Sequence, residues 1–148
     1  MRQIIYAMQF TGHAAPVAGK TDVLKATTIA SSCAIESGVG PGGLDTVLRP
    51  IDGDVAAFES EVTITGENSF LESGTIRFGN DHKFRFGTVG HGYLGSSADP
   101  GLRHGTVTWK VEYGEGQFQH ASGLITSNFT IDASGRVVDH HFGLLFVP

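Results

Sequence analysis

The chain has 148 residues, a formal charge of −5, 40% hydrophobic residues and one cysteine. A chain of this length buries enough surface to form a core without metals or disulfides, so we expect one domain over residues 1–148. The acidic balance and the lack of a basic run argue against nucleic acid as a partner.

The N-terminal residues predict a strand rather than a targeting segment. Residues 1–10 hold one basic residue, and Gln3 and Gln9 interrupt their apolar run, so they lack the pattern of a signal peptide. No stretch approaches the roughly eighteen apolar residues of a membrane-spanning helix. We therefore expect a cytoplasmic protein without a membrane partner.

Short runs rich in Val, Ile, Thr and Phe follow one another along the chain, with turn-forming residues about every ten positions, which is typical of an all-β sandwich or barrel. Segment 21–36 is also predicted to be extended, because its centre is β-branched and serine-rich, which lowers helix propensity. The turns are expected at residues 37–43, 52–54, 66–69, 79–82, 113–116 and 132–135.

Four segments alternate between apolar and polar side chains, as strands with one buried face do. They are 61–65, 75–78, 83–86 and 106–112. In the last of them Val107, Trp109 and Val111 share one face. Closing such a sheet removes its exposed edges, so we expect an all-β fold, a small antiparallel closed barrel of about eight strands.

The final segment, 137–147, leaves no polar face near the C-terminus, where Phe142, Leu144, Leu145 and Phe146 lie close together. A strand that is apolar on both sides must be covered on both sides. In a small β domain the outer cover usually comes from another subunit. The segment therefore predicts a homo-oligomer.

The stretch 90–105 is rich in Gly, Ser and Pro and is predicted to be the longest irregular connection. Two interpretations stay open: a surface loop whose polar residues face water, or a lid over the barrel mouth. As a lid it would bring His91, Tyr93 and His104 to an apolar pocket. There, histidine and tyrosine could polarise or protonate a carbonyl or phenol oxygen.

Charged side chains on the polar faces of the predicted strands also allow two interpretations. One is a solvated exterior with weak cross-strand ion pairs. The other places some of them inside, where a carboxyl group such as Glu61 could move a proton while an arginine holds an anionic oxygen. The candidate catalytic residues are Glu61, His91 and His104, and the candidate ligand-binding residues are Arg77, Arg85, Tyr93, Trp109 and His120.

Seven histidines suggest a metal site, but their spacing does not support one. His140 and His141 are adjacent, so on a strand they point to opposite faces and cannot bind one ion together. A metal site needs three or four converging ligands, and the least implausible set is His91, His104 and His120. We predict neither a metal nor a cofactor.

The stretch Gly114-Glu-Gly-Gln-Phe-Gln-His-Ala-Ser-Gly123 has the form G-x-G-x-F-x-x-A-x-G. It resembles the strand–turn–strand signature of the allene oxide cyclase-like barrels, a group that includes dirigent proteins. The resemblance implies an eight-stranded antiparallel barrel, a dimer or trimer, and a mostly apolar pocket in the barrel mouth. It also implies that the protein steers or isomerises small hydrophobic molecules without a redox cofactor. No catalytic residue of the plant cyclase is carried over to a position here.

Three functions follow as hypotheses. The first is a cofactor-independent isomerase, cyclase or lyase that acts on a small apolar molecule by proton transfer. The second is a non-catalytic carrier with the same pocket, and the third is a structural oligomer whose barrel is filled by its own side chains. A solid interior would exclude the first two, and a hollow one without an ionisable residue would favour the carrier.

Overall fold

The computed structural model describes residues 1–148, and its regular secondary structure is almost entirely β-strand. The strands are β1 (Arg2–Pro16), β2 (Val23–Ala30), β3 (Cys33–Gly40), β4 (Gly43–Pro50), β5 (Ala56–Ile64), β6 (Ser69–Phe78), β7 (His82–Thr88), β8 (Gly92–Ser96), β9 (Leu102–Glu115), β10 (Ser122–Asp132) and β11 (Arg136–Val147). One 3-10 turn, η1 (Gly116–Phe118), follows β9. The structure contains no helix long and apolar enough to cross a lipid bilayer.

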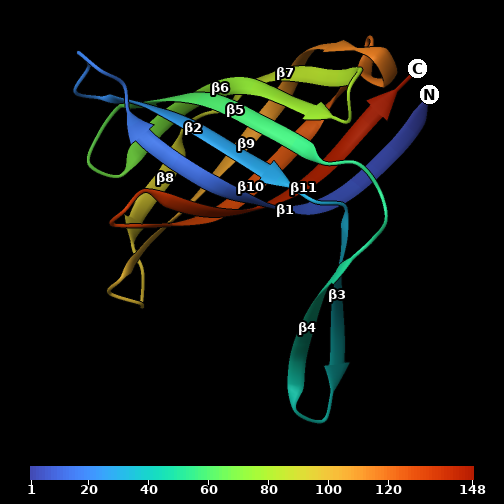
Figure 1. Cartoon of the computed structure of the whole chain (residues 1–148), viewed down its shortest axis with the longest axis horizontal. Coiled ribbons are helices and arrows are strands. Elements are labelled where there is room, and N and C mark those ends of the chain that lie inside the picture. Colours follow the sequence, from blue (N-terminus) through green and yellow to red (C-terminus); the bar gives the residue numbers. More distant parts are fainter.

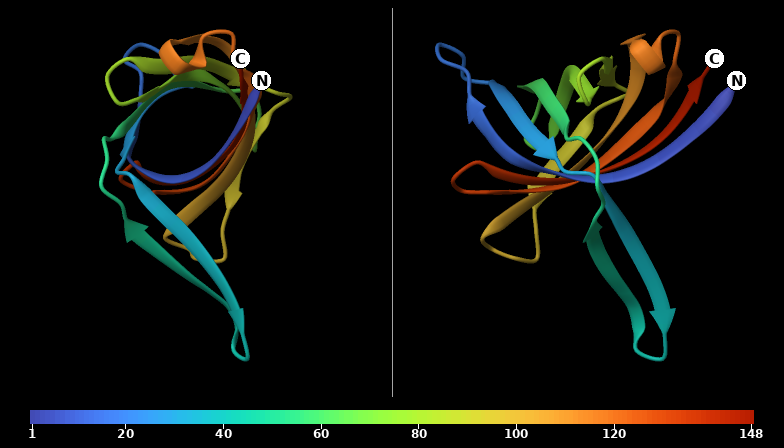
Figure 2. Two further views of the ribbon diagram at one scale, coloured as in Figure 1. Left: turned by 90° about the vertical axis from the view of Figure 1, so that its right-hand side faces the viewer. Right: turned by 45° about the vertical axis from the view of Figure 1, so that its right-hand side comes forward.

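Eight strands close into an antiparallel barrel, which the left view of Figure 2 shows along its axis. Around the barrel the order is β10-β11-β1-β2-β5-β6-β7-β9, and β9 pairs in turn with β10 (Figure 1). The predicted fold class is therefore confirmed. Segment 21–36 is extended rather than helical, as predicted, but it forms two strands instead of one: β2 and the beginning of β3, which belong to different sheets.

The prediction of one long irregular connection over 90–105 is wrong, because most of it is strand. β8 pairs with β9, where Tyr93 faces Thr106, and its first residues also pair with β6. β8 thus continues the barrel wall past the end of β7. The glycines that suggested a loop allow close packing instead, since a Cβ on Gly92 would overlap an aromatic ring of the core. Only residues 90–91 and 97–101 of this stretch remain as connections, and of its two interpretations the lid does not form.

Aromatic side chains fill the middle and one end of the barrel. On β9, Val107 and Trp109 are buried as the alternation predicts, and Trp109 lies 5.4 Å from Phe58 between ring centroids. Phe118 of η1 packs against Phe84 at 5.1 Å and thereby closes one end of the barrel. Burial of each such side chain contributes about 1.5–3 kcal/mol to the hydrophobic stabilisation.

The strands β3 and β4 form a separate hairpin that projects from the barrel (Figure 1). In the views of Figures 1 and 2 the hairpin stands off on the side where β1 and β11 lie. Its ladder runs from the Cys33–Pro50 pair to the Gly40–Gly43 pair, so the turn is tighter than the predicted 37–43.

Candidate functional site

A cavity of about 450 Å³ opens at the end of the barrel opposite η1. The β5–β6 turn at 66–69 and the β10–β11 turn near Asp132 form part of its mouth. Its walls are mostly apolar and include Leu24, Val62, Ile64, Phe70, Leu94, Phe129, Ile131 and Val137. A cavity of this volume with few polar groups is typical of a small-molecule site.

Two carboxyl groups reach the cavity from the barrel interior. Glu72 on β6 and Asp139 on β11 line it together with Thr28 and Phe58. The two carboxyl residues are only 8% and 6% exposed. Both point inward because side chains alternate along a strand, and Glu72 shares its face of β6 with the buried Phe70.

Burial raises the pKa of Glu72 to about 8, because the charged form loses its hydration inside the barrel. A hydrogen bond from the Ser60 hydroxyl, 2.6 Å long, opposes this shift, and the negative charge of Asp139 adds to it. The nearby indole of Trp109 also lowers the pKa, although its Nε1 makes no hydrogen bond of regular geometry. The Glu72 carboxyl group therefore keeps its proton at neutral pH.

Asp139 joins the cavity to a buried histidine. Its Oδ1 accepts a 2.6 Å hydrogen bond from the Ser127 hydroxyl, and its Oδ2 lies 3.0 Å from Nε2 of His141. Because a carboxylate only accepts hydrogen bonds, Nε2 carries the proton in this contact. The His141 ring stacks on Phe10 at 4.1 Å, and its Nδ1 is buried without a partner. The orientation of His141 is thus determined from two sides.

The rim of the cavity is polar. Glu67 and Asp132 lie there, and Arg103 at the start of β9 is the one cation among the lining residues. The Ser134 hydroxyl donates a 2.6 Å hydrogen bond to Asp132, which lowers the pKa of that carboxyl group. The mouth therefore offers charges of both signs above an apolar interior.

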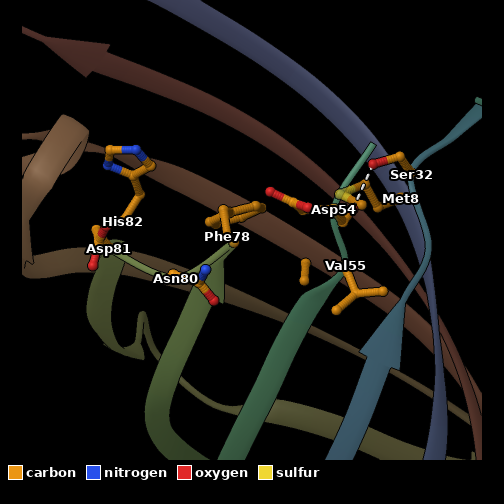
Figure 3. Close-up of a pocket in the computed structure, with 10 residues that line it drawn as sticks. Met8, Ser32, Asp54, Val55, Phe78, Asn80, Asp81 and His82 are labelled. Carbon is orange, nitrogen blue, oxygen red and sulfur yellow. Dashed lines mark hydrogen bonds between the residues drawn. The ribbon is translucent and has the colours of Figure 1, made fainter. Parts of the chain in front are cut away.

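A second cavity, of about 410 Å³, lies at the opposite end of the barrel (Figure 3). Met8, Val55 and Phe78 lie beside Asp54 and other polar residues in it, and the Ser32 hydroxyl donates a 2.6 Å hydrogen bond to the Asp54 carbonyl. Its ionisable side chains are exposed, so they are hydrated like ordinary surface groups. The cavity above Glu72 is therefore the candidate site.

None of the predicted site residues lines that cavity. Glu61, Arg77 and Arg85 occupy outward positions on β5, β6 and β7 and are exposed, because their neighbours along each strand take the inward positions. The solvated-exterior interpretation describes these three residues. A cross-strand ion pair, Lys83 with Glu115 at 3.3 Å, lies on the same exterior.

The remaining predicted residues are also dispersed. Tyr93 and His104 are neighbours on the outside, with ring centroids 6.3 Å apart, and His91 is exposed before β8. His120 is exposed between η1 and β10, at the end of the barrel away from the cavity. Trp109 alone is inside, next to His141 at 5.1 Å between ring centroids.

The least implausible metal set, His91, His104 and His120, is not brought together. In the whole structure no three His, Cys, Asp or Glu side chains converge in an arrangement that could hold an ion. As predicted, His140 and His141 point to opposite faces of β11, since the first is exposed and the second buried.

The candidate site residues that were not predicted from the sequence are Glu72, Asp139 and His141. Their signal is the same alternation that identified the other strands. Asp139 and His141 lie at alternate positions of β11 on the same face as Val137 and Leu145, and all four residues are buried. Extending the alternation of 75–78 back along β6 would have placed Glu72 inside in the same way.

The closed barrel with a cavity at its mouth is a dirigent-like barrel fold. Its solved neighbours include the pterocarpan synthase dirigent protein PsPTS1, 14% identical with a TM-score of 0.57 over 99% of this chain and 96% of that one. The pterocarpan synthase dirigent protein GePTS1 is 11% identical, with a TM-score of 0.51 over 99% and 92% of the two chains.

These structures support the dirigent part of the predicted group at the level of fold, and they do not bear specifically on the allene oxide cyclase part. No protein-family model matches the sequence. No curated protein matches it either.

Proposed function

We propose that the protein binds a small, largely apolar molecule in the open cavity and exchanges a proton with it through Glu72. The observation that carries this proposal is a carboxyl group, protonated at neutral pH, that lines an otherwise mostly apolar cavity. A neutral acid donates a hydrogen bond to a carbonyl, phenol or ether oxygen without the cost of a second buried charge.

The chemistry that fits this arrangement is isomerisation, cyclisation or elimination by proton transfer. Glu72 gives its proton to an oxygen or an unsaturated carbon of the ligand, and its carboxylate then takes a proton from a neighbouring carbon. The acid is regenerated, in an elimination the protonated oxygen leaves as water, and atoms and charge balance without a redox step. A pKa of about 8 is close to the working range of a general acid at neutral pH.

The fold neighbours support a small-molecule role, because both are named as synthases of pterocarpans. The internal hydrogen bonds of Glu72 and Asp139 are equally compatible with a carrier, since they stabilise the polar groups of the cavity before any ligand arrives. Binding and conversion are therefore tested separately.

Binding is tested by a thermal-shift screen of hydrophobic acids, phenols and terpenoid alcohols. Ala26 lines the cavity and is buried, so Ala26→Phe should fill part of it, whereas Ala15→Phe adds the same side chain at an exposed position of β1. A compound that stabilises the wild type and Ala15→Phe but not Ala26→Phe binds in the cavity. If no compound of these classes stabilises the wild type, the proposal fails.

Conversion is tested by chromatography and NMR of each binder after incubation with the protein for hours. Glu72→Gln keeps the size of the side chain and removes the transferable proton, and Glu61→Gln is the matched change at an exposed site on the neighbouring strand. Turnover that Glu72→Gln abolishes and Glu61→Gln retains supports the enzyme. Binding without any chemical change assigns the protein as a carrier.

A further inference from the structure

The outside of the barrel has a charged side and an uncharged side. Outward positions of β5, β6 and β7 carry Glu59, Glu61, Arg77, Lys83 and Arg85. On β10, β11 and β1, the outward positions within 122–130, 138–146 and 3–11 carry no Asp, Glu, Lys or Arg. Proteins that stay monomeric usually scatter charges over all of their exposed surface, so this uncharged side is unusual.

The uncharged side is also apolar. Its large outward side chains, which we call the apolar wall, are Ile5, Leu124, Phe142, Leu144 and Phe146. They are contiguous, because Leu144 pairs across the ladders with both Ile5 and Leu124, and the two phenylalanines flank it along β11. Ile5 is 62% exposed and Phe142 54%. Exposed apolar surface that spans three neighbouring strands marks an interaction site.

The hairpin separates apolar from charged side chains in the same way. Its ladder places Ile35 opposite Leu48 and Val39 opposite Leu44, all on one face that we call the apolar face of the hairpin. Glu36 and Arg49 form an ion pair on the opposite face. Val39 is 88% exposed and Leu44 72%, so nothing in the chain covers the apolar face near the tip.

An isolated two-stranded hairpin is at most marginally stable in water. This one nevertheless keeps a regular ladder over its whole length, from Cys33–Pro50 to Gly40–Gly43, while standing away from the barrel (Figure 2). Its tip does not pack on the wall of its own barrel, since Val39 and Leu44 stay exposed. Its apolar face therefore lacks the packing that normally stabilises such a pair of strands.

Neither apolar surface is large enough alone for a stable interface, but together they approach the required area. Two strands of eight residues cover about 27 Å by 10 Å, or roughly 270 Å² in projection. Three strands of the wall cover about 30 Å by 14 Å, or roughly 420 Å². In a reciprocal pair each copy buries its own hairpin face and a matching area of its wall, together about 540 Å² in projection, which is about two thirds of the roughly 800 Å² that each partner contributes to a stable complex.

We propose that the hairpin of one copy of this chain packs its apolar face against the apolar wall of a second copy. Both surfaces belong to the same chain, both lack charges, and they have similar lengths. In this arrangement the Glu36–Arg49 pair stays in solvent. The oligomer predicted from the apolar C-terminal strand thereby gains a specific contact, and the contact does not depend on the chemistry proposed for Glu72.

The first test is the mass of the full chain in solution, measured by sedimentation equilibrium at micromolar concentration. The wild type is expected to be oligomeric, and the double variant V39D/L44D is expected to be a monomer. Val47→Asp places one negative charge on the opposite, charged face of the hairpin, where the valine is 55% exposed, and should remain oligomeric. On the barrel, Phe142→Asp should give a monomer, while Leu71→Asp, at an exposed outward position of β6, should not.

The second test is a mixed disulfide. Cys33 is the one cysteine, so Cys33→Ser provides a background without thiols. Leu44→Cys and Phe142→Cys are then made in separate chains, mixed and oxidised. The control is a mixture of Leu44→Cys and Leu71→Cys chains. A yield of heterodimeric disulfide well above that of the control supports the contact between hairpin and wall.

Other results overturn the proposal. A monomeric wild type does so, as does an oligomer that V39D/L44D or Phe142→Asp leaves intact. Loss of the oligomer in Val47→Asp as well shows that the apolar face is not the contact. A monomer that binds phosphatidylcholine vesicles through Val39 and Leu44 assigns the hairpin to a membrane instead. Far-UV circular dichroism of every variant separates dissociation from unfolding.

Discussion

The Ser60 hydroxyl donates a 2.6 Å hydrogen bond to the Glu72 carboxyl group, and both side chains are buried between β5 and β6. This bond lowers the pKa of Glu72, yet burial outweighs it and raises the pKa to about 8. The consequence is a pH-dependent stability that can be measured without knowing the ligand.

Glu72 should make the wild type lose stability as the pH rises from about 5 to 8. In the unfolded chain this carboxyl group ionises near its ordinary pKa of about 4.3, whereas in the folded barrel it keeps its proton to about 8. The contribution of Glu72 to stability is fully present below the unfolded pKa and falls by about 1.4 kcal/mol per pH unit between the two pKa values.

Urea unfolding of the wild type and Glu72→Gln at several pH values checks this. The difference between their unfolding free energies should change with pH in the stated direction. Glu61→Gln, at an exposed position on the adjacent strand, should follow the wild type. A difference between wild type and Glu72→Gln that is constant from pH 5 to 8 would contradict the pKa assigned to Glu72.

Tyr6→Phe should stabilise the protein. The Tyr6 hydroxyl is buried without a hydrogen-bond partner, and burial raises the pKa of this phenol above its usual value. The edge-on contact of the ring with Phe78 at 5.5 Å does not need the hydroxyl. Removal of an unpaired buried polar group should raise the unfolding free energy by about 1 kcal/mol. Chemical denaturation measures this, with Tyr113→Phe, an exposed tyrosine, expected to show no change.

Ser127→Ala should destabilise the protein by about 2 kcal/mol, because it leaves a buried carboxyl oxygen of Asp139 without its partner. Ser122→Ala on the same strand, where the serine is exposed, should cost much less. The two variants are compared by urea unfolding at pH 7. Equal effects would show that the Ser127 hydrogen bond contributes little to the stability of Asp139 in the barrel.

Arg103→Ala should weaken the binding of anionic ligands at the cavity mouth. Arg103 is the one cation among the lining residues, and an exposed cation contributes modestly to pairing with a carboxylate, about five-fold in affinity. Titration calorimetry with a hydrophobic acid and its methyl ester checks this, since only the acid should lose affinity. Arg85→Ala removes the same charge far from the cavity and should affect neither ligand. Equal losses for acid and ester would contradict the role of Arg103.

Alternation along strands was sufficient to predict the closed barrel and the inward face of β9. Alternation did not predict the site because the predicted segments were shorter than the strands. Segment 75–78, for example, does not include the first half of β6, where Glu72 lies. Charged residues that alternate with apolar ones, such as Arg77 and Arg85, have the pattern of a barrel exterior. Charged residues at the inward-facing positions of a strand, such as Asp139, are rarer because burying a charge is costly. They are therefore better indicators of a site inside the barrel.

The pairing of β8 with β9 was not predictable from composition. Glycine and serine are typical of loops, and only tertiary packing shows that the small residue at Gly92 is needed beside Phe70. The projecting hairpin was also not predictable, because alternation shows that a segment is a strand but not whether that strand joins the barrel or pairs outside it.

Phe118 and Phe84 pack together at the end of the barrel opposite the mouth of the Glu72 cavity, so a ligand of Glu72 enters through that mouth. A bound ligand therefore places one end beside the Glu72 carboxyl group, while its other end stays near bulk water at the mouth. The protein should therefore discriminate strongly between ligands that differ at the buried end, and weakly between ligands that differ in length at the end near the mouth.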